Sequence, residues 1–307
     1  MGAHISEQMH PRICLGTAQF GLPYGITNTV GKVAESEVHA LLAEAAAACL
    51  TMLDTAQAYG DAEAVIGRAL PAGHCFQLIS KLPAQSQATF SLDNRFAWDQ
   101  ALESSLGRLG QPRLDAFLLH STADLRKPGG EHLRQWMLSL RERGLARRLG
   151  VSIYEMDDLD GVAPDLLDVV QLPLSLYDQR LLAGGTIARL RSQGCAVHAR
   201  SLFLQGLLLS PAASWPAWVN SGARDHHSKL EHLAAERGSS LLECALGFAR
   251  AQKDLEAVVL GVCSRRELEQ TLKAWGNSSP WVGNEWSSWQ LNSAEILDPR
   301  RWPRSKA

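Results

Sequence analysis

Four side chains capable of acid–base chemistry follow short apolar segments of the chain: Asp54, Tyr59, Lys81 and His120. A phenol with an unperturbed pKa of about 10 is a weak proton donor at neutral pH. A neighbouring ammonium group lowers such a pKa, so we expect Lys81 to lower the pKa of Tyr59 while Asp54 keeps Lys81 charged and oriented. His120 would donate a second hydrogen bond to the same substrate oxygen. These residue types predict protonation of a carbonyl oxygen, with Tyr59 as general acid.

The same residues leave other reactions open. None of the four can deliver a hydride, so a reduction would need a nicotinamide cofactor. Alternatively, Lys81 could act as the Schiff-base nucleophile of an aldolase, provided that its amine is not held by Asp54 and Tyr59. A metal-dependent hydrolase is disfavoured, because His226 and His227 have no partner ligands at a useful spacing. We predict no metal site.

These side chains can act together only if the fold brings the ends of several apolar segments to one place. Apolar segments of strand length alternate with segments of helical period, which predicts a (β/α)8 barrel whose strand ends meet at one face. The expected strands are residues 12–15, 51–54, 76–80, 114–119, 146–151, 167–172, 195–199 and 257–260. The expected helices are residues 35–49, 62–70, 95–108, 131–143, 156–162, 179–193, 226–236, 240–252 and 264–274.

A doubly wound sheet is the alternative fold. It would normally carry G-x-G-x-x-G after the first strand, and residues 16–21 read Gly-Thr-Ala-Gln-Phe-Gly instead. We therefore expect residues 1–307 to form a single domain, with the barrel at about 12–275 and a tail at 276–307. A long loop at 201–224 interrupts the repeat. Five of the nine tryptophans lie in residues 275–302, where they either fix the tail to the barrel or line a pocket.

Composition narrows the class of protein. The 30 Lys and Arg residues against 32 Asp and Glu give a formal net charge of −2, which argues against nucleic acid or an anionic membrane as a partner held by bulk charge. The chain is 46% hydrophobic, enough for a core. Six cysteines without a C-x-x-C pair, and a start without an apolar stretch, predict a reduced, cytoplasmic protein. The oligomeric state is not indicated.

Short phrases spread along the chain resemble the aldo/keto reductase family. They occur in the family's order, and Asp54 and Tyr59 have its five-residue step. The matching phrases are Leu15-Gly-Thr-Ala-Gln-Phe-Gly21, Leu53-Asp-Thr-Ala56 with Tyr59-Gly60, Ser80-Lys-Leu82, Leu114-Asp-Ala-Phe-Leu-Leu-His120, Leu149-Gly-Val-Ser152, Val170-Gln171, Ser201-Leu-Phe-Leu-Gln-Gly-Leu207 and Leu260-Gly-Val-Cys-Ser264.

The resemblance implies a catalytic tetrad of Asp54, Tyr59, Lys81 and His120, a small-molecule carbonyl substrate, and an extended NADP cofactor across the barrel mouth. The cofactor contacts that it implies are Gly16, Thr17, Asp54, Ser152, Gln171, Arg200, Ser201, Leu202, Gln205, Gly206, Gly261, Ser264, Arg265 and Gln270. Of these, Ser152 and Gln171 match positions that hold the nicotinamide carboxamide, and the backbone of residues 201–206 would face the pyrophosphate.

The chain departs from the family pattern at several of these positions. Ile153 replaces an expected Asn, and Arg200 stands where many members stack an aromatic ring on the nicotinamide. The adenosine 2′-phosphate is expected at the start of the last barrel helix, where Arg265 or Arg266 would hold it. This favours NADPH over NADH, unless both arginines are simply solvated. The second functional reading is a nucleotide-binding regulatory protein of the same fold with little turnover, similar to the β subunits of voltage-gated potassium channels.

Overall fold

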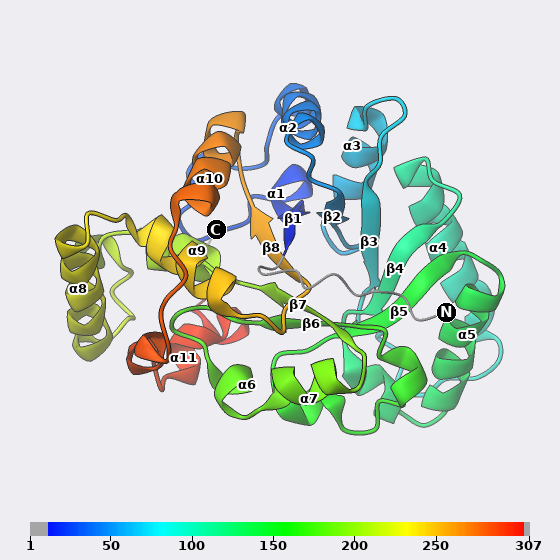
Figure 1. Cartoon of the computed structure of the whole chain (residues 1–307). Helices are drawn as coiled ribbons and strands as arrows, with labels where there is room; N and C mark the ends of the chain where they lie inside the picture. Colours follow the sequence, from blue (N-terminus) through cyan, green and yellow to red (C-terminus); the bar gives the residue numbers. More distant parts are fainter. Residues whose placement is uncertain (1–11, 304–307) are drawn as a thin grey trace, which may run out of the picture.

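Eight parallel strands close into a barrel in this computed structural model, which describes residues 12–303. Each strand pairs with the next one along the chain, and the last strand pairs with the first (Figure 1). The strands are β1 (Arg12–Gly16), β2 (Met52–Asp54), β3 (Gln77–Leu82), β4 (Leu114–Leu119), β5 (Ala146–Ser152), β6 (Val169–Pro173), β7 (Ala196–Arg200) and β8 (Ala257–Gly261). The predicted (β/α)8 barrel is confirmed.

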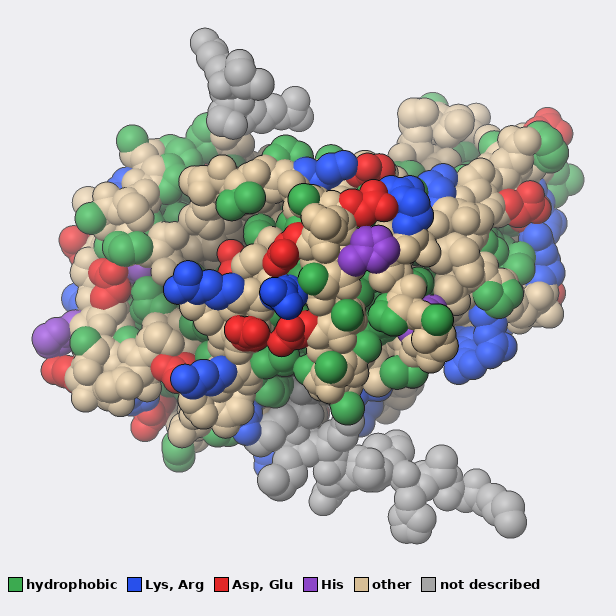
Figure 2. All heavy atoms as spheres, turned by 90° about the horizontal axis from the view of Figure 1, so that it is seen from above, with side chains coloured by type: hydrophobic (Ala, Val, Ile, Leu, Met, Phe, Trp, Pro, Cys, Tyr) green, Lys and Arg blue, Asp and Glu red, His purple; other side chains and the backbone are tan. Residues whose placement is uncertain are grey.

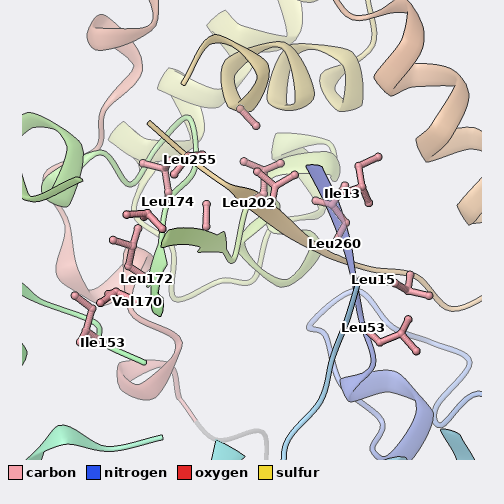
Figure 3. Close-up of a cluster of buried hydrophobic side chains, with 14 of the residues drawn as sticks. Ile13, Leu15, Leu53, Ile153, Val170, Leu172, Leu174, Leu202, Leu255 and Leu260 are labelled. Carbon is pink, nitrogen blue, oxygen red and sulfur yellow. The ribbon is translucent and has the colours of Figure 1, made fainter. Parts of the chain in front are cut away.

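The strands are apolar on both faces because each face meets a different core. On β1, Cys14 points into the barrel, while Ile13 and Leu15 pack outward. The interior core contains Cys14, Met52, Ile79, Ala116, Leu118, Val169, Ala196 and Ala257. The outer core packs around the strands, and Figure 3 shows part of it beside β1, β6 and β8. Burial on both faces explains why the strands read as continuous apolar runs.

Helices surround the strands on the outside of the barrel (Figure 1). The α-helices are α1 (Ala18–Gly21), α2 (Glu35–Ala47), α3 (Ala62–Ala69), α4 (Asn94–Leu109), α5 (Gly130–Glu142), α6 (Arg180–Ala183), α7 (Thr186–Ser192), α8 (Ser221–Glu236), α9 (Leu241–Ala251), α10 (Arg265–Asn277) and α11 (Ala294–Leu297). Short 3-10 turns are η1 (Thr122–Arg126), η2 (Met156–Leu159), η3 (Pro164–Leu166), η4 (Leu204–Leu209), η5 (Ala212–Ser214), η6 (Glu285–Trp289) and η7 (Pro299–Arg301).

Three of the expected helices differ from the structure. The helix expected at 156–162 is wrong, because only η2 and η3 connect β5 to β6, with Gly161 at φ +78° between them. Gly185, at φ +71°, divides the helix expected at 179–193 into α6 and α7. Helix α8 begins inside the loop expected at 201–224, because the side chain of Asn220 accepts a hydrogen bond from Ala223 N and caps the helix.

The C-terminal tail packs against the barrel through its tryptophans. The Trp281 indole donates to the carbonyl of Cys244, and Trp302 lies 5.4 Å from Trp218 between ring centroids. Gln179 donates to the carbonyl of Trp286 at 2.7 Å. In the described part of the chain, no tryptophan lines the cavity at the carboxyl ends of the barrel strands, whereas Trp281 lines a second pocket beside the start of α9 and the end of α10. Both sequence-based alternatives therefore have support: the tryptophans fix the tail to the barrel, and one of them also lines a pocket. The single-domain organisation stays a prediction.

The surface mixes both signs of charge. On the face shown in Figure 2, Lys and Arg side chains lie among Asp and Glu side chains. No helix within residues 12–303 is long and apolar enough to cross a membrane.

Candidate active site

A cavity of about 450 Å³ opens at the carboxyl ends of the barrel strands. Its size is that of a small-molecule site. Asp54, Tyr59, His120 and Gln171 line one part of it, and Gly261 lies in another part. Residues that are far apart in the sequence thus share one cleft, because parallel strands of a barrel all end at the same face.

Asp54 and Lys81 form a buried ion pair at the base of the cleft. The ammonium Nζ of Lys81 lies 2.7 Å from both carboxylate oxygens of Asp54 and also donates to the carbonyl of Thr55 at 2.8 Å. The side chain of Lys81 is 0% exposed and that of Asp54 is 4% exposed. Gln171 donates to Asp54 Oδ1 from another strand. A lysine with these partners is poorly suited to act as a Schiff-base nucleophile.

Tyr59 is held above this pair by a tight turn after β2. Its backbone N–H donates to Ala56, and Gly60 follows with φ +58°. Gly21 approaches so closely that a Cβ there would lie 1.8 Å from the carbonyl oxygen of Tyr59. The short helix α1 and the turn can pack in this way only because both positions are glycine. The close backbone contact between Gly21 and Tyr59 therefore fixes the turn that carries Tyr59.

His120 and Lys81 flank the Tyr59 ring. The His120 ring lies edge-on at 6.0 Å between centroids, and Lys81 Nζ lies 5.3 Å from the centroid of the tyrosine ring. Burial, and then the charges of Lys81 and Arg200, lower the pKa of His120 to about 4. The imidazole is therefore neutral at neutral pH and can donate one N–H hydrogen bond.

The expectation that Lys81 lowers the pKa of Tyr59 is wrong. Burial, and then the carboxylate of Asp54, raise the pKa of Tyr59 well above its ordinary value. The charge of Lys81 is balanced by Asp54, which leaves burial as the dominant effect. Tyr59 thus stays protonated at neutral pH. Protonated phenol is the form that a general acid requires.

Two buried polar atoms on β5 and β6 have no hydrogen-bond partner within residues 12–303: Ser152 Oγ and Gln171 Oε1. The strand register pairs Ser152 with Gln171. Buried polar atoms without partners are rare and call for an explanation. A carboxamide would satisfy both, because its NH2 group can donate to Gln171 and its oxygen can accept from Ser152. These residues fit the nicotinamide end of the expected cofactor.

The loop after β7 adopts an unusual backbone at the cleft. Ser201, Leu204 and Gln205 all have φ between +48° and +61°, in the left-handed region that non-glycine residues rarely adopt. Such conformations are concentrated at functional sites. Thr27, from the loop after β1, lies so near Gly206 that a Cβ there would be 2.0 Å from its hydroxyl oxygen. The loops after β1 and β7 thus meet across the cleft.

Arg200 presents a cation rather than an aromatic ring. Its guanidinium stacks on the Tyr154 ring at 4.1 Å, and it donates to the carbonyl of Ile153 at 2.9 Å. Arg300 stacks on the same ring at 3.7 Å. Both Arg200 and Tyr154 line the cavity.

At the other end of the cleft, two carboxylates accept hydrogen bonds from backbone amides at the start of α10. Glu37, on α2, accepts a hydrogen bond from Arg265 N at 2.7 Å, and Glu267 accepts one from Cys263 N at 2.7 Å. Ser264 caps the helix by accepting from Glu267 N at 3.2 Å. The side chain of Arg265 is exposed at this point.

Most of the expected site residues share this cleft. Those that line it are Gly16, Thr17, Asp54, Tyr59, His120, Gln171, Arg200, Ser201, Leu202, Gln205, Gly206 and Gly261. Lys81 and Ser152 are buried next to it. Three expected residues do not line the cavity that the described residues form: Ser264, Arg265 and Gln270. Ser264 caps α10, and the side chains of Arg265 and Gln270 are exposed.

Sequence reasoning missed Glu267, Cys263, Tyr24 and Tyr154, which also line the cleft. The spacing of Ser264 and Glu267 matches the capping pattern S-x-x-E and could have drawn attention to Glu267. Within residues 12–303 there is no group of three or more His, Cys, Asp or Glu side chains that could hold a metal ion.

Comparison with known proteins agrees with this geometry. The model of the aldo/keto reductase family matches residues 12–289. An aldo-keto reductase of Mycolicibacterium vanbaalenii is 34% identical over 140 residues, which cover 43% of this chain and 46% of that protein. Aldo-keto reductase Rv2971 of Mycobacterium tuberculosis is 30% identical over 162 residues, covering 49% of this chain and 54% of that protein. The chain spans about half the length of these curated relatives.

Solved structures share the fold. The holo form of aldo-keto reductase AKR11C1 from Bacillus halodurans has a TM-score of 0.72 at 18% identity, covering 95% of both chains. A putative aldo-keto reductase from Pseudomonas aeruginosa, PA4992, has a TM-score of 0.63 at 19% identity, covering 88% of this chain and 91% of that chain. The family match extends from β1 past α10 and includes Asp54, Tyr59, Lys81 and His120. The chain therefore belongs to the aldo/keto reductase family.

Proposed function

We propose that this protein reduces an aldehyde or ketone to an alcohol, with a nicotinamide dinucleotide as cofactor and Tyr59 as general acid. The observation that carries the proposal is the convergence of Tyr59, His120 and the buried Asp54–Lys81 pair on one cleft. The partner is then a small-molecule carbonyl compound. A cytoplasmic location stays a prediction.

Each residue of the tetrad has a defined role in this proposal. When bound, the reduced dinucleotide supplies a hydride to the carbonyl carbon. Tyr59 donates its proton to the carbonyl oxygen, so that C=O becomes CH–OH and the phenolate is reprotonated from solvent. His120, as a neutral imidazole, donates a hydrogen bond to the same oxygen and stabilises the negative charge that develops on it. The ion pair of Asp54 and Lys81 fixes the floor under the phenol.

The cofactor part of the proposal rests on the two unpartnered atoms, Ser152 Oγ and Gln171 Oε1. They match the donor and acceptor of a carboxamide, which supports a nicotinamide ring beside Tyr59. Which of the two dinucleotides binds is a separate question, and Arg265 and Arg266 led to the sequence-based prediction of NADPH over NADH. Two carboxylates, those of Glu37 and Glu267, accept hydrogen bonds at the start of α10, where the 2′-phosphate of NADPH is expected.

The test is consumption of NADH and NADPH with a panel of aromatic and aliphatic aldehydes, by wild-type protein and by the Tyr59→Phe variant. General acid catalysis contributes roughly 10²–10⁴-fold, so we expect kcat to fall by about that factor while the dinucleotide Kd stays unchanged. Equal turnover by the two proteins would refute the acid role of Tyr59.

The regulatory alternative gives a different result in the same experiment. A nucleotide-binding protein with little turnover would bind NADH or NADPH tightly and leave every carbonyl in the panel unreduced. Binding without turnover would therefore replace the reductase proposal.

A further inference from the structure

We propose that Glu37 and Glu267 make this protein select a dinucleotide without a 2′-phosphate, so that NADH is preferred to NADPH. This inference rests on the proposed function, because it assumes that a nicotinamide dinucleotide occupies the cleft. It concerns the end of the cleft at α10, away from Tyr59 and His120.

The direction of the dinucleotide follows from the cleft itself. The unpartnered atoms Ser152 Oγ and Gln171 Oε1 fit the nicotinamide end. In the order of the barrel strands, β6 is followed by β7, with the left-handed backbone of residues 201–206 after it, and then by β8, with Gly261, Cys263 and Glu267. The adenosine end of an extended dinucleotide would therefore lie at the start of α10.

A phosphate bound at a helix start uses free backbone amides and nearby cations. At α10 three of these amides are already occupied: Arg265 N by Glu37, Cys263 N by Glu267, and Glu267 N by Ser264. A 2′-phosphate would have to displace a carboxylate from each of the first two, and both displaced carboxylates would remain close to it. The helix start thus does not fit this phosphate.

The nearby cations do not offset these charges in the cavity. Arg265 and Arg266 are exposed, and neither side chain lines the cavity among the described residues. Glu267, a carboxylate, does line it. A carboxylate at this place suits the free hydroxyls of an adenosine ribose, which donate hydrogen bonds to it, and repels a phosphate.

Glu37 reaches this place from a distant part of the chain. It is on α2, 228 residues before Arg265. The packing of α2 beside α10 therefore brings a second negative charge to a helix start whose own sequence, Ser-Arg-Arg-Glu, contains two arginines. This explains why local sequence favours NADPH while the assembled site favours NADH.

The experiment measures binding to the ligand-free protein, so it does not depend on turnover. The Kd values of NADH and NADPH are obtained by titration at one fixed, low ionic strength, following the quenching of tryptophan fluorescence. Like charges placed side by side weaken binding, and solvent screening limits the loss at these partly or fully exposed carboxylates. We expect wild-type protein to bind NADH about tenfold more tightly than NADPH, or better.

The variants Glu37→Gln and Glu267→Gln keep an amide oxygen as acceptor for the helix-start N–H groups and remove the charge. We expect each to tighten NADPH binding several-fold, with the double variant showing the larger gain, while NADH binding stays the same or weakens. Glu269→Gln is the matched control, because it removes the same charge from an exposed position of the same helix. Its ratio of NADPH to NADH affinity should equal that of wild type.

The outcomes separate this inference from the proposed function. Wild-type protein that binds NADPH as tightly as NADH or more tightly, and loses NADPH affinity on Arg265→Ala, would overturn the selectivity alone. Variants at Glu37 and Glu267 that behave like Glu269→Gln would also overturn it. Failure to bind either dinucleotide would overturn the proposed function, and the selectivity with it.

Discussion

The two ends of the cleft are built differently. At the end near Tyr59, Asp54, Lys81 and Gln171 come from strands whose register is fixed by the barrel. The charges of Asp54 and Lys81 are paired and buried there. At the α10 end, Glu37 and Glu267 come from helices and remain partly or fully exposed. Strand register gives the first end a fixed chemistry. The second end depends on which side chains neighbouring helices bring to it, so cofactor choice can change there without disturbing the tetrad.

The largest effect that we expect is on the free energy of unfolding, when the buried ion pair of the cleft is broken. Lys81→Met leaves the Asp54 carboxylate buried beside Gln171 without its cation, which should cost about 3–5 kcal/mol of the free energy of unfolding. The measurement is urea denaturation of the variant and wild type.

Two further variants test that interpretation. Lys32→Met breaks the exposed ion pair with Asp61 and should cost about 1 kcal/mol or less. The double variant Asp54→Asn with Lys81→Met should recover part of the loss, because no charge is then left buried alone. If Lys81→Met and Lys32→Met lost equal stability, the expected contrast between the buried ion pair of the cleft and an exposed ion pair would be wrong.

A smaller effect, on the dinucleotide Kd, tests whether Ser152 lies at the nicotinamide end of the cleft. Ser152→Ala removes the hydroxyl that we expect to donate to the carboxamide, and one such hydrogen bond is worth about 1 kcal/mol, or about fivefold in Kd. NADH and NADPH should weaken by the same factor, because both carry the same carboxamide. Ser192→Ala, at an exposed serine of α7, is the control. A change in the NADH to NADPH ratio on Ser152→Ala would contradict this placement.

The smallest effect expected is on the pH profile of the reaction. The pKa of His120 is lowered to about 4 and that of Tyr59 is raised well above its ordinary value, so neither group titrates between about pH 6 and pH 9. The kcat/KM of the carbonyl substrate should be flat over this range. A bell-shaped profile that disappears in His120→Gln would show that the imidazole titrates inside it.

The same shift has a consequence for stability. The folded-state pKa of His120 lies below its unfolded value of about 6.5, so unfolded chains bind this proton more readily. The stabilisation due to its neutral form is complete above about pH 6.5 and is lost as the pH falls towards 4. The difference in unfolding free energy between wild type and His120→Gln, measured by urea denaturation at several pH values, should change over this interval and be constant above it.

The contrast between the strand-based and the helix-based end of the cleft also explains which features of this protein can be predicted from its sequence. The barrel strands were predictable because a parallel strand buried on both faces leaves a continuous apolar run. The convergence of Asp54, Tyr59, Lys81 and His120 was predictable because polar residues at the ends of such runs must meet at one face of a barrel. The helix at 156–162 was not, since Gly161 and Pro164 limit that segment to 3-10 turns.

The barrel, the convergence of Asp54, Tyr59, Lys81 and His120, and the family resemblance could thus be predicted from the amino-acid sequence alone. The direction of the Tyr59 pKa shift and the presence of Glu37 at the start of α10 became visible only in the folded chain. The two groups of features depend on contacts over different distances along the chain. Strand patterns and helix caps depend on residues that are neighbours in the sequence. The burial of Tyr59 and the contact between Glu37 and Arg265, which are 228 residues apart, depend on how whole helices and strands pack.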